Sequence, residues 1–339
     1  LPVEILDYRH MDPEERAAAL KQFETTDRAK PFEFAEAPLM RVALIRLTDE
    51  RFHMLWTSHH ILFDGWSLPI MMEGFLSGYE TLVAGKEIVS EEEDRYEDYI
   101  RHIDRGNREQ EETYWRNYMQ GVEQSTLLPF IGTTTERTKG AGIYKSIYFQ
   151  VDAERTEKIQ AFGQKHHITI NTIMQGVWSS LLHNYTGNDD IVFGVIVAGR
   201  PDVLTNVEKR VGLYINTLPL HSNISEDQEI LSWLQRMQDE QVASRRYEHT
   251  PLHQIQALTG VNGDLFDSLL VFENYPVSKV VGAREWSLQV ENVQVNEQTN
   301  YPLTIIISSS DQITVQFTYN TGLLSEAYAK EILGHFEYT

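Results

Sequence analysis

The chain has 339 residues, 41% of them hydrophobic and 23% charged, an ordinary globular composition at a length that predicts two packed lobes. Fifty acidic side chains face 29 basic ones, and the formal net charge of −21 argues against binding to nucleic acid or to anionic lipid. The sequence contains no cysteine, which excludes disulfides, thiolate catalysis and cysteine-ligated zinc.

Nothing in the chain has the pattern of a membrane span or a leader. No apolar run approaches the ~20 residues that cross a bilayer. Residues 1–15 lack both the charged start and the apolar block of a signal peptide. We therefore expect a soluble, cytoplasmic protein.

The first 130 residues alternate between strand and helix patterns. Asp12, Pro13 and Glu15 form a capping-box signature that predicts a helix after an opening strand. Two β-like runs separated by Asp49-Glu50 predict a hairpin, and a polar bend leads from it to a helix that Ser67 caps. The expected elements are a strand at 1–7, strands at 41–48 and 52–58, a helix at 67–84 and a long charged helix at 91–119.

A stretch rich in Gly, Thr and Lys interrupts this pattern at 131–142, and we interpret it as a linker between lobes 1–130 and 143–339. Beyond it strands and helices alternate again, so the fold class is α/β or α+β with mixed sheets. Asp152 and Asn171 are expected to open helices, and the His166-His167 pair to end one. The other expected elements are strands at 143–151, 190–197, 269–273, 304–309 and 313–319, and helices from 230 and at 325–336.

The stretch with the clearest chemical content is SHHILFDGWS, residues 58–67, on a strand-to-helix connection. Successive side chains of an extended chain point to opposite faces, so His59 and His60 are poorly placed to share a metal ion. One imidazole is expected to turn inward and the other to lie beside the site, where a histidine can accept a proton near neutral pH. Asp64 is a candidate orienting group or buried acid, and Gly65 lets a backbone approach a ligand closely.

The string resembles the HHxxxDG signature of condensation domains of nonribosomal peptide synthetases, in the chloramphenicol-acetyltransferase-like superfamily. Further stretches resemble other motifs of that family in the same order, and together they cover essentially the whole chain. They are KPF at 30–32 with APLMR at 37–41, YEDY at 96–99, VGLYINTL at 211–218, YEHTPL at 247–252 and FDSLLVFENY at 266–275.

The resemblance implies two related lobes in a V, each a mixed sheet with flanking helices. It implies that an amide bond forms between a donor acyl or peptidyl thioester and the amine of an acceptor aminoacyl thioester. Both would be carried on 4'-phosphopantetheine of upstream and downstream carrier domains, beside an adenylation domain. No cofactor or metal of the domain's own is implied.

The resemblance also assigns residues. The catalytic group would be His60, His59, Asp64 and Gly65: His60, the second histidine, would face the reaction channel, and Gly65 would offer a backbone N–H or space near the thioester. Asp64 would also form a structural salt bridge, for which Arg200 is our candidate. Trp66, Ser67 and Asn216 are expected beside the channel, although Asn216 could equally be a hydrogen-bonding residue at a strand end. Because an α-amino group has a reference pKa of about 8, strong base catalysis is hardly required, and we favour positioning and electrostatic stabilisation by His60.

The residues in and around the signature also distinguish this sequence from other types of domain in the superfamily. A heterocyclising domain carries Asp at the first histidine, and plant-type acyltransferases carry a DFGWG motif that this sequence lacks. Epimerisation domains follow HHxxxD with a Val-Ser-Trp pattern, whereas Asp64-Gly65-Trp66-Ser67 suits the type that accepts an L-configured donor. A non-catalytic, carrier-binding relative remains the competing class, although such domains tend to lose the second histidine.

The family's opening motifs, SxAQxRLW and RHExLRTxF, do not occur in the sequence. We therefore expect that the chain begins inside the N-terminal lobe and represents part of a longer domain.

Overall fold

The computed structural model describes residues 1–89, 95–132, 137, 140, 142–225, 227–273, 282, 285–309 and 311–339. Two compact units account for these residues, the first made of 1–71 with 209–213 and the second of 72–208 with 214–339. These units are compact parts of the chain, whereas the predicted lobes 1–130 and 143–339 are units of the expected fold. The two-lobe division therefore stays a prediction.

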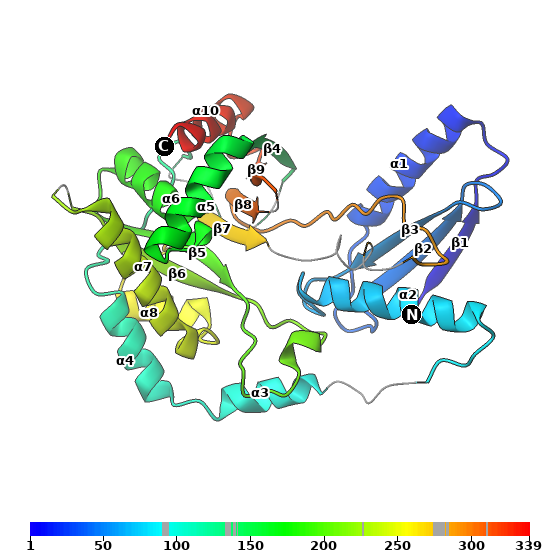
Figure 1. Ribbon diagram of the computed structural model, residues 1–339, viewed down its shortest axis with the longest axis horizontal. Coiled ribbons are helices and arrows are strands. Elements are labelled where there is room, and N and C mark those ends of the chain that lie inside the picture. The colour runs from blue at the N-terminus through cyan, green and yellow to red at the C-terminus, as the bar shows by residue number, and fades with distance from the viewer. Residues whose placement is uncertain are drawn as a thin grey trace. The chain divides into compact units, whose positions relative to one another are not determined.

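The first unit is a three-stranded sheet with one long helix (Figure 1). Its strands are β1 (Val3–Asp7), β2 (Met40–Arg46) and β3 (Phe52–Ser58), with β1 parallel to β2 and β2 antiparallel to β3. Helix α1 (Pro13–Ala29) begins at Asp12, and the capping box with Glu15 is confirmed.

Alternate residues of β2 and β3 face α1. Ala43 and Ile45 are buried, and His53, opposite Ile45 in the register, lies 3.2 Å from Glu24 of α1. Arg41 points to the same face and pairs with Asp27 in the last turn of α1. The predicted hairpin therefore forms and carries α1 on one face.

The second unit is built on a six-stranded sheet with the strand order β4-β9-β8-β7-β5-β6. Its strands are β4 (Tyr144–Gln150), β5 (Asp190–Val197), β6 (Asn216–Asn223), β7 (Ser268–Glu273), β8 (Leu303–Ser309) and β9 (Ile313–Asn320). Strand β5 pairs parallel with β7, and β7 pairs parallel with β8, whereas the other pairings are antiparallel.

Helices flank this sheet (Figure 1). The helices of the second unit are α3 (Tyr96–Asp104), α4 (Arg108–Tyr118), α5 (Ala153–His166), α6 (Ile170–Thr186), α7 (Ile230–Ser244), α8 (Leu252–Thr259) and α10 (Glu326–Tyr338), and α2 (Ser67–Val83) starts in the first unit and ends in the second. Trp178 of α6 is fully buried and packs against Phe317 of β9 and Phe336 of α10. The sheet and the helices packed on it share one hydrophobic core.

Three helix predictions need correction. Ser67 does not cap α2 but is its first residue, and the side chain of Asp64 accepts a hydrogen bond from its N–H. The single helix predicted for 91–119 is two helices, α3 and α4, because Asn107 caps α4 by accepting a hydrogen bond from the Gln110 N–H. Residues 91–94 of that prediction lie outside the described residues. Helix α6 starts at Ile170 rather than Asn171, since the hydroxyl of Thr169 accepts from the Thr172 N–H.

Candidate active site

The signature stretch forms the connection between β3 and α2, and all its residues belong to the first unit, which extends to Met71. The two histidines have different surroundings. His60 sits at the tip of the turn with an exposed side chain, whereas His59 is half-buried. The two imidazoles therefore differ in exposure, and their expected places at a reaction channel stay a prediction.

His59 is fixed from both its backbone and its ring. Its N–H donates to the carbonyl of Leu39 at 2.9 Å, and its carbonyl accepts from the Leu62 N–H at 3.1 Å. Its ring Nδ1 accepts from the Ile61 N–H at 3.1 Å. The imidazole therefore closes the turn that carries His60.

Asp64 is buried, with 1% of its surface exposed, and caps the start of α2. Its Oδ1 accepts from the N–H of Ser67 at 3.0 Å and from the hydroxyl of Ser67 at 2.9 Å. A carboxylate so enclosed needs its hydrogen bonds satisfied within the protein, and those from Ser67 hold the turn together. The predicted Asp64–Arg200 ion pair joins residues of different units and stays a prediction.

Gly212 joins this turn from far along the chain. Its carbonyl accepts from the Asp64 N–H at 3.1 Å, and its N–H donates to the Ser67 hydroxyl at 3.1 Å. Gly212 belongs to the VGLYINTL stretch, so two of the family-like motifs meet in one hydrogen-bonded cluster of the first unit. Ser67 is fully buried there, and its predicted place beside a channel stays a prediction.

Asn216, Gly65 and Trp66 are the other residues predicted for the site. The amide nitrogen of Asn216 donates to the carbonyls of Glu248 and Thr250, both at 2.8 Å, so it bonds at the strand end as one of its two expected roles requires. The carbonyl of Gly65 accepts from the Leu68 N–H at 3.3 Å, and Trp66 is half-buried. Channel lining by Trp66 and Asn216 stays a prediction.

Arg200 belongs to the second unit, where its guanidinium carbon lies 4.3 Å from the ring centroid of Tyr214. Its Nη1 donates to the carbonyl of Val207 at 2.6 Å. Gly199 before it has φ of 60°, and an added Cβ would lie only 1.7 Å from the carbonyl oxygen of Tyr214. Glycine at 199 is therefore what lets the Arg200 segment approach Tyr214.

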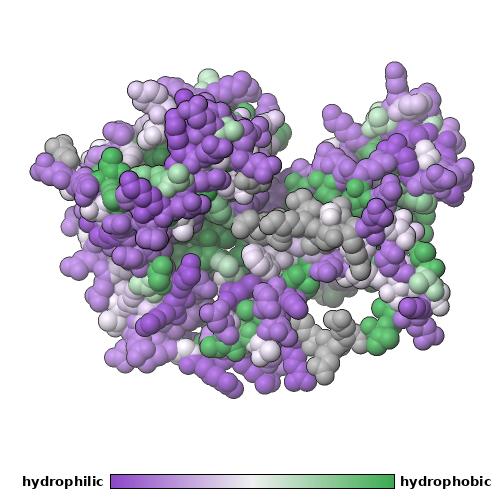
Figure 2. Space-filling model, viewed as in Figure 1, coloured by the Kyte–Doolittle hydropathy of each residue, from purple (hydrophilic) through white to green (hydrophobic). Residues whose placement is uncertain are grey.

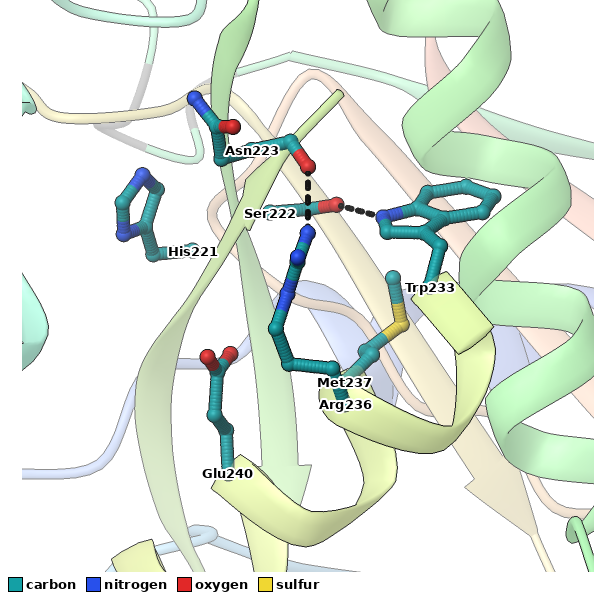
Figure 3. Close-up of a pocket in the computed structure, with 7 residues that line it drawn as sticks. All are labelled: His221, Ser222, Asn223, Trp233, Arg236, Met237 and Glu240. Carbon is teal, nitrogen blue, oxygen red and sulfur yellow. Dashed lines mark hydrogen bonds between the residues drawn. The ribbon is translucent and has the colours of Figure 1, made fainter. Parts of the chain in front are cut away.

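A cavity of about 40 Å³ in the second unit lies between β6 and α7 (Figure 3). Its lining includes Ser222, which accepts from the Trp233 indole at 3.1 Å, and Arg236, which donates to the carbonyl of Asn223 at 3.0 Å. The space holds about one or two water-sized molecules, too little for a thioester arm. None of the predicted site residues lines it.

Sequence reasoning missed the surroundings of His59. The rings of Phe32 and Phe34 meet the His59 ring edge-on, with centroids 6.4 Å and 4.8 Å away. Arg41 in turn lies over Phe32. The signal that could have found this cluster is the KPF and APLMR stretch, which resembles a family motif just before the signature.

Among the described residues, no group of three or more His, Asp or Glu side chains is arranged to hold a metal ion. Likewise, none of the helices in the described part of the chain combines the length and apolarity that a membrane span requires.

Comparison with known proteins identifies the family. The family model described as "Condensation domain" matches residues 1–339. The chain is 36% identical over 333 residues to a linear gramicidin synthase of Brevibacillus parabrevis, and the match covers 98% of this chain and 4% of that protein. It is 32% identical to bacitracin synthase 3 of Bacillus licheniformis over 318 residues, 93% of this chain and 5% of that protein. The chain thus spans a small part of these relatives.

Solved structures show the same fold. The first condensation domain of the calcium-dependent antibiotic synthetase, in complex with a substrate analogue, matches with a TM-score of 0.72 at 18% identity, over 99% of this chain and 76% of that chain. The X-domain from teicoplanin biosynthesis matches with a TM-score of 0.79 at 18% identity, over 100% of this chain and 78% of that chain. The expected fold class, mixed sheets with flanking helices in the chloramphenicol-acetyltransferase-like arrangement, is confirmed.

The family model matches the whole chain, and the curated relatives described above are peptide synthases. This chain therefore belongs to the condensation-domain family of nonribosomal peptide synthetases, whose members form amide bonds in peptide synthesis.

Proposed function

We propose that this domain joins a donor acyl or peptidyl thioester to the amine of an acceptor aminoacyl thioester, with His60 at the reacting amine. The observation that carries the proposal is the exposed imidazole of His60 on a turn that hydrogen bonds hold at both ends. A turn fixed in this way can present one side chain in one direction, which is what a reaction between two bound partners requires.

Amide formation from a thioester and an amine requires no cofactor of the domain's own. The lone pair of the amine attacks the thioester carbonyl carbon, and an oxyanion and a positively charged nitrogen form. The carbon–sulfur bond then breaks, and the leaving thiolate takes up the proton that the nitrogen loses. His60 stabilises the charged intermediate and can relay that proton.

The proposal also includes the carrier domains that hold the substrates and the neighbouring domains of the synthetase. Both thioesters are carried on 4'-phosphopantetheine of an upstream and a downstream carrier domain, next to an adenylation domain, in the cytoplasm. Support comes from the relatives, which are synthases far longer than this chain. The Asp64-Gly65-Trp66-Ser67 sequence favours an L-configured donor.

The competing candidate is a non-catalytic or epimerisation-type relative that binds carriers. The fold alone does not distinguish a catalytic condensation domain from such a relative, because both would have the same architecture. The retained His60 favours catalysis.

The test mixes the polypeptide that carries this domain with a donor and an acceptor carrier protein, each loaded with its thioester, without ATP or added metal. We expect amide product on the acceptor carrier, detected by intact-protein mass spectrometry. Carrier binding without product supports the non-catalytic relative, and an inverted α-carbon in the donor incubated alone supports the epimerisation type.

A further inference from the structure

Arg41 of β2 is the centre of a nearly buried ion pair beneath the signature turn. Its Nε lies 2.6 Å from Oδ1 of Asp27 in α1, and the two side chains are 14% and 13% exposed. Thr57 of β3 donates to the other carboxylate oxygen at 2.5 Å. Burial raises the pKa of Asp27, but the hydrogen bonds from Arg41 and Thr57 outweigh it and hold that pKa below its usual value. The pair therefore stays charged at neutral pH.

The guanidinium of Arg41 also fixes Phe32. Its central carbon lies 4.4 Å from the centroid of the Phe32 ring, within the range of a cation–π contact. Its Nη2 donates to the carbonyl of Lys30 at 3.1 Å, which holds the backbone two residues before Phe32. Ring and backbone are thus tied to the same ion pair.

Phe32, held in this way, packs against the ring of His59. The two rings meet almost at right angles, at 88°, with centroids 6.4 Å apart. The orientation of the His59 ring is what directs its Nδ1 at the Ile61 N–H, and that hydrogen bond spans His60. Every residue in this chain of contacts lies in the first unit.

We propose that Asp27, Arg41 and Phe32, here called the Arg41 brace, position His60 by holding the ring of His59. The three are positioning residues, because they act on the reaction only through His59. The inference rests on the proposed function. A displacement of about 1 Å in a reacting group can lower a rate about 100-fold, so a loosened turn has a measurable effect.

The kinetic test compares Phe32→Leu in two backgrounds, the natural chain and the His59→Ala variant. We expect Phe32→Leu to lower kcat about 10-fold in the natural background, with little change in KM for either loaded carrier. In the H59A background it should have no further effect, because the residue that transmits the constraint is gone. Equal losses in both backgrounds would overturn the proposal.

A matched control is Arg9→Gln. Arg9 also belongs to the first unit and also pairs with aspartates, Asp7 at 2.7 Å and Asp49 at 2.6 Å. It lies beyond the other end of the sheet, since Asp7 pairs with Arg46 whereas Ser58, next to the signature histidines, pairs with Met40. We expect wild-type kcat for Arg9→Gln, and a loss of about 10-fold there would contradict a brace specific to Arg41.

A second measurement does not depend on activity. In the natural chain, long-range ¹H–¹⁵N spectra should show the His59 Nδ1 without a proton, and the Ile61 amide should exchange slowly. Phe32→Leu and Arg41→Lys should each speed exchange of the Ile61 amide about 10-fold. Unchanged exchange in an enzyme that condenses its substrates would refute the brace, whereas faster exchange in a protein without condensation activity would refute the proposed function alone.

Discussion

Glu273, the last residue of β7, has an unusual carboxyl group. Burial, with the nearby charge of Glu297, raises its pKa from 4.5 to about 7. The unfolded chain therefore releases this proton at lower pH than the folded chain does. The favourable contribution of the group to stability is fully present below pH 4.5 and is lost as the pH rises through about 7.

We predict that Glu273→Gln stabilises the protein at pH 8 and changes little at pH 4.5, because the amide removes a partly buried charge that exists only at the higher pH. The upper bound on the gain is ~3.5 kcal/mol, from ~1.4 kcal/mol for each tenfold change in proton affinity between a pKa of 4.5 and one of about 7. Urea unfolding at the two pH values measures it. Glu297→Gln is the matched variant and should give part of the same gain, whereas an equal effect of Glu273→Gln at both pH values would contradict the raised pKa.

Some features of single residues could be predicted from the sequence, and others could not. A buried acid at Asp64 was one of the two roles expected from the signature string, and the side chain is indeed buried. The hydrogen bond between Ser67 and Gly212 joins residues 145 apart, and no local pattern encodes which distant backbone a serine hydroxyl meets. The same holds for Phe32, whose importance depends on Arg41 and His59 meeting it in space.

At the scale of elements, Arg137 forms a buried ion pair with Asp267, the residue before β7. Arg137 donates to the carboxylate of Asp267 at 2.7 Å and to the carbonyls of Leu128 and Ile131 at 2.9 Å and 2.7 Å. Asp267 has no exposed surface and also accepts from the Leu128 N–H. Burial raises the pKa of Asp267, and Arg137 and Leu128 counter it by stabilising the ionised form.

We predict that Arg137→Met destabilises the second unit by about 3–5 kcal/mol, because it leaves a buried carboxylate without its partner. Adding Asp267→Asn should restore part of the loss, since the amide carries no charge. Arg155→Met is the matched control, because Arg155 pairs with Asp152 at 3.5 Å in an exposed position. Denaturant unfolding that shows equal losses for Arg137→Met and Arg155→Met would contradict the prediction.

The edge strand β6 shows a further element-scale feature that periodicity does not reveal. The outward N–H of Thr217 donates to the side-chain oxygen of Asn216, and that of His221 donates to the hydroxyl of Tyr118. Pro219 between them has no N–H at all. The edge therefore offers few donors to another chain, a known protection against edge-to-edge pairing.

Strands and helices with strong patterns were predictable. The nearly all-apolar run at 190–197 is β5, and its residues 191–195 are all buried, as expected of a strand covered on both faces of the sheet. The helix ending at the second histidine pair is α5, with His167 as a left-handed C-cap. The break between α3 and α4 was missed because charged and aromatic residues continue the helical pattern across Gly106 and Asn107, and the cap at Asn107 outweighs that pattern.

At the scale of the whole molecule, the formal net charge of −21 acts on every part of the fold. Hydrophilic residues cover much of the face of each unit seen in Figure 2. Repulsion among like charges destabilises a compact chain, and salt screens it over ~10 Å at 0.1 M. We predict that raising NaCl from about 20 mM to about 200 mM increases Tm by a few degrees. A Tm that falls over this range would mean that exposed ion pairs outweigh the repulsion.

The central claim is that the imidazole of residue 60 takes part in amide formation. Its most direct test is the single-turnover rate of condensation on loaded carriers for the natural chain, His60→Ala and His10→Ala. His10 is the matched control, an exposed histidine in a turn of the same unit. We predict that His60→Ala slows amide formation by about 100-fold or more at unchanged carrier binding, whereas His10→Ala keeps the natural rate. A natural rate for His60→Ala would contradict the account.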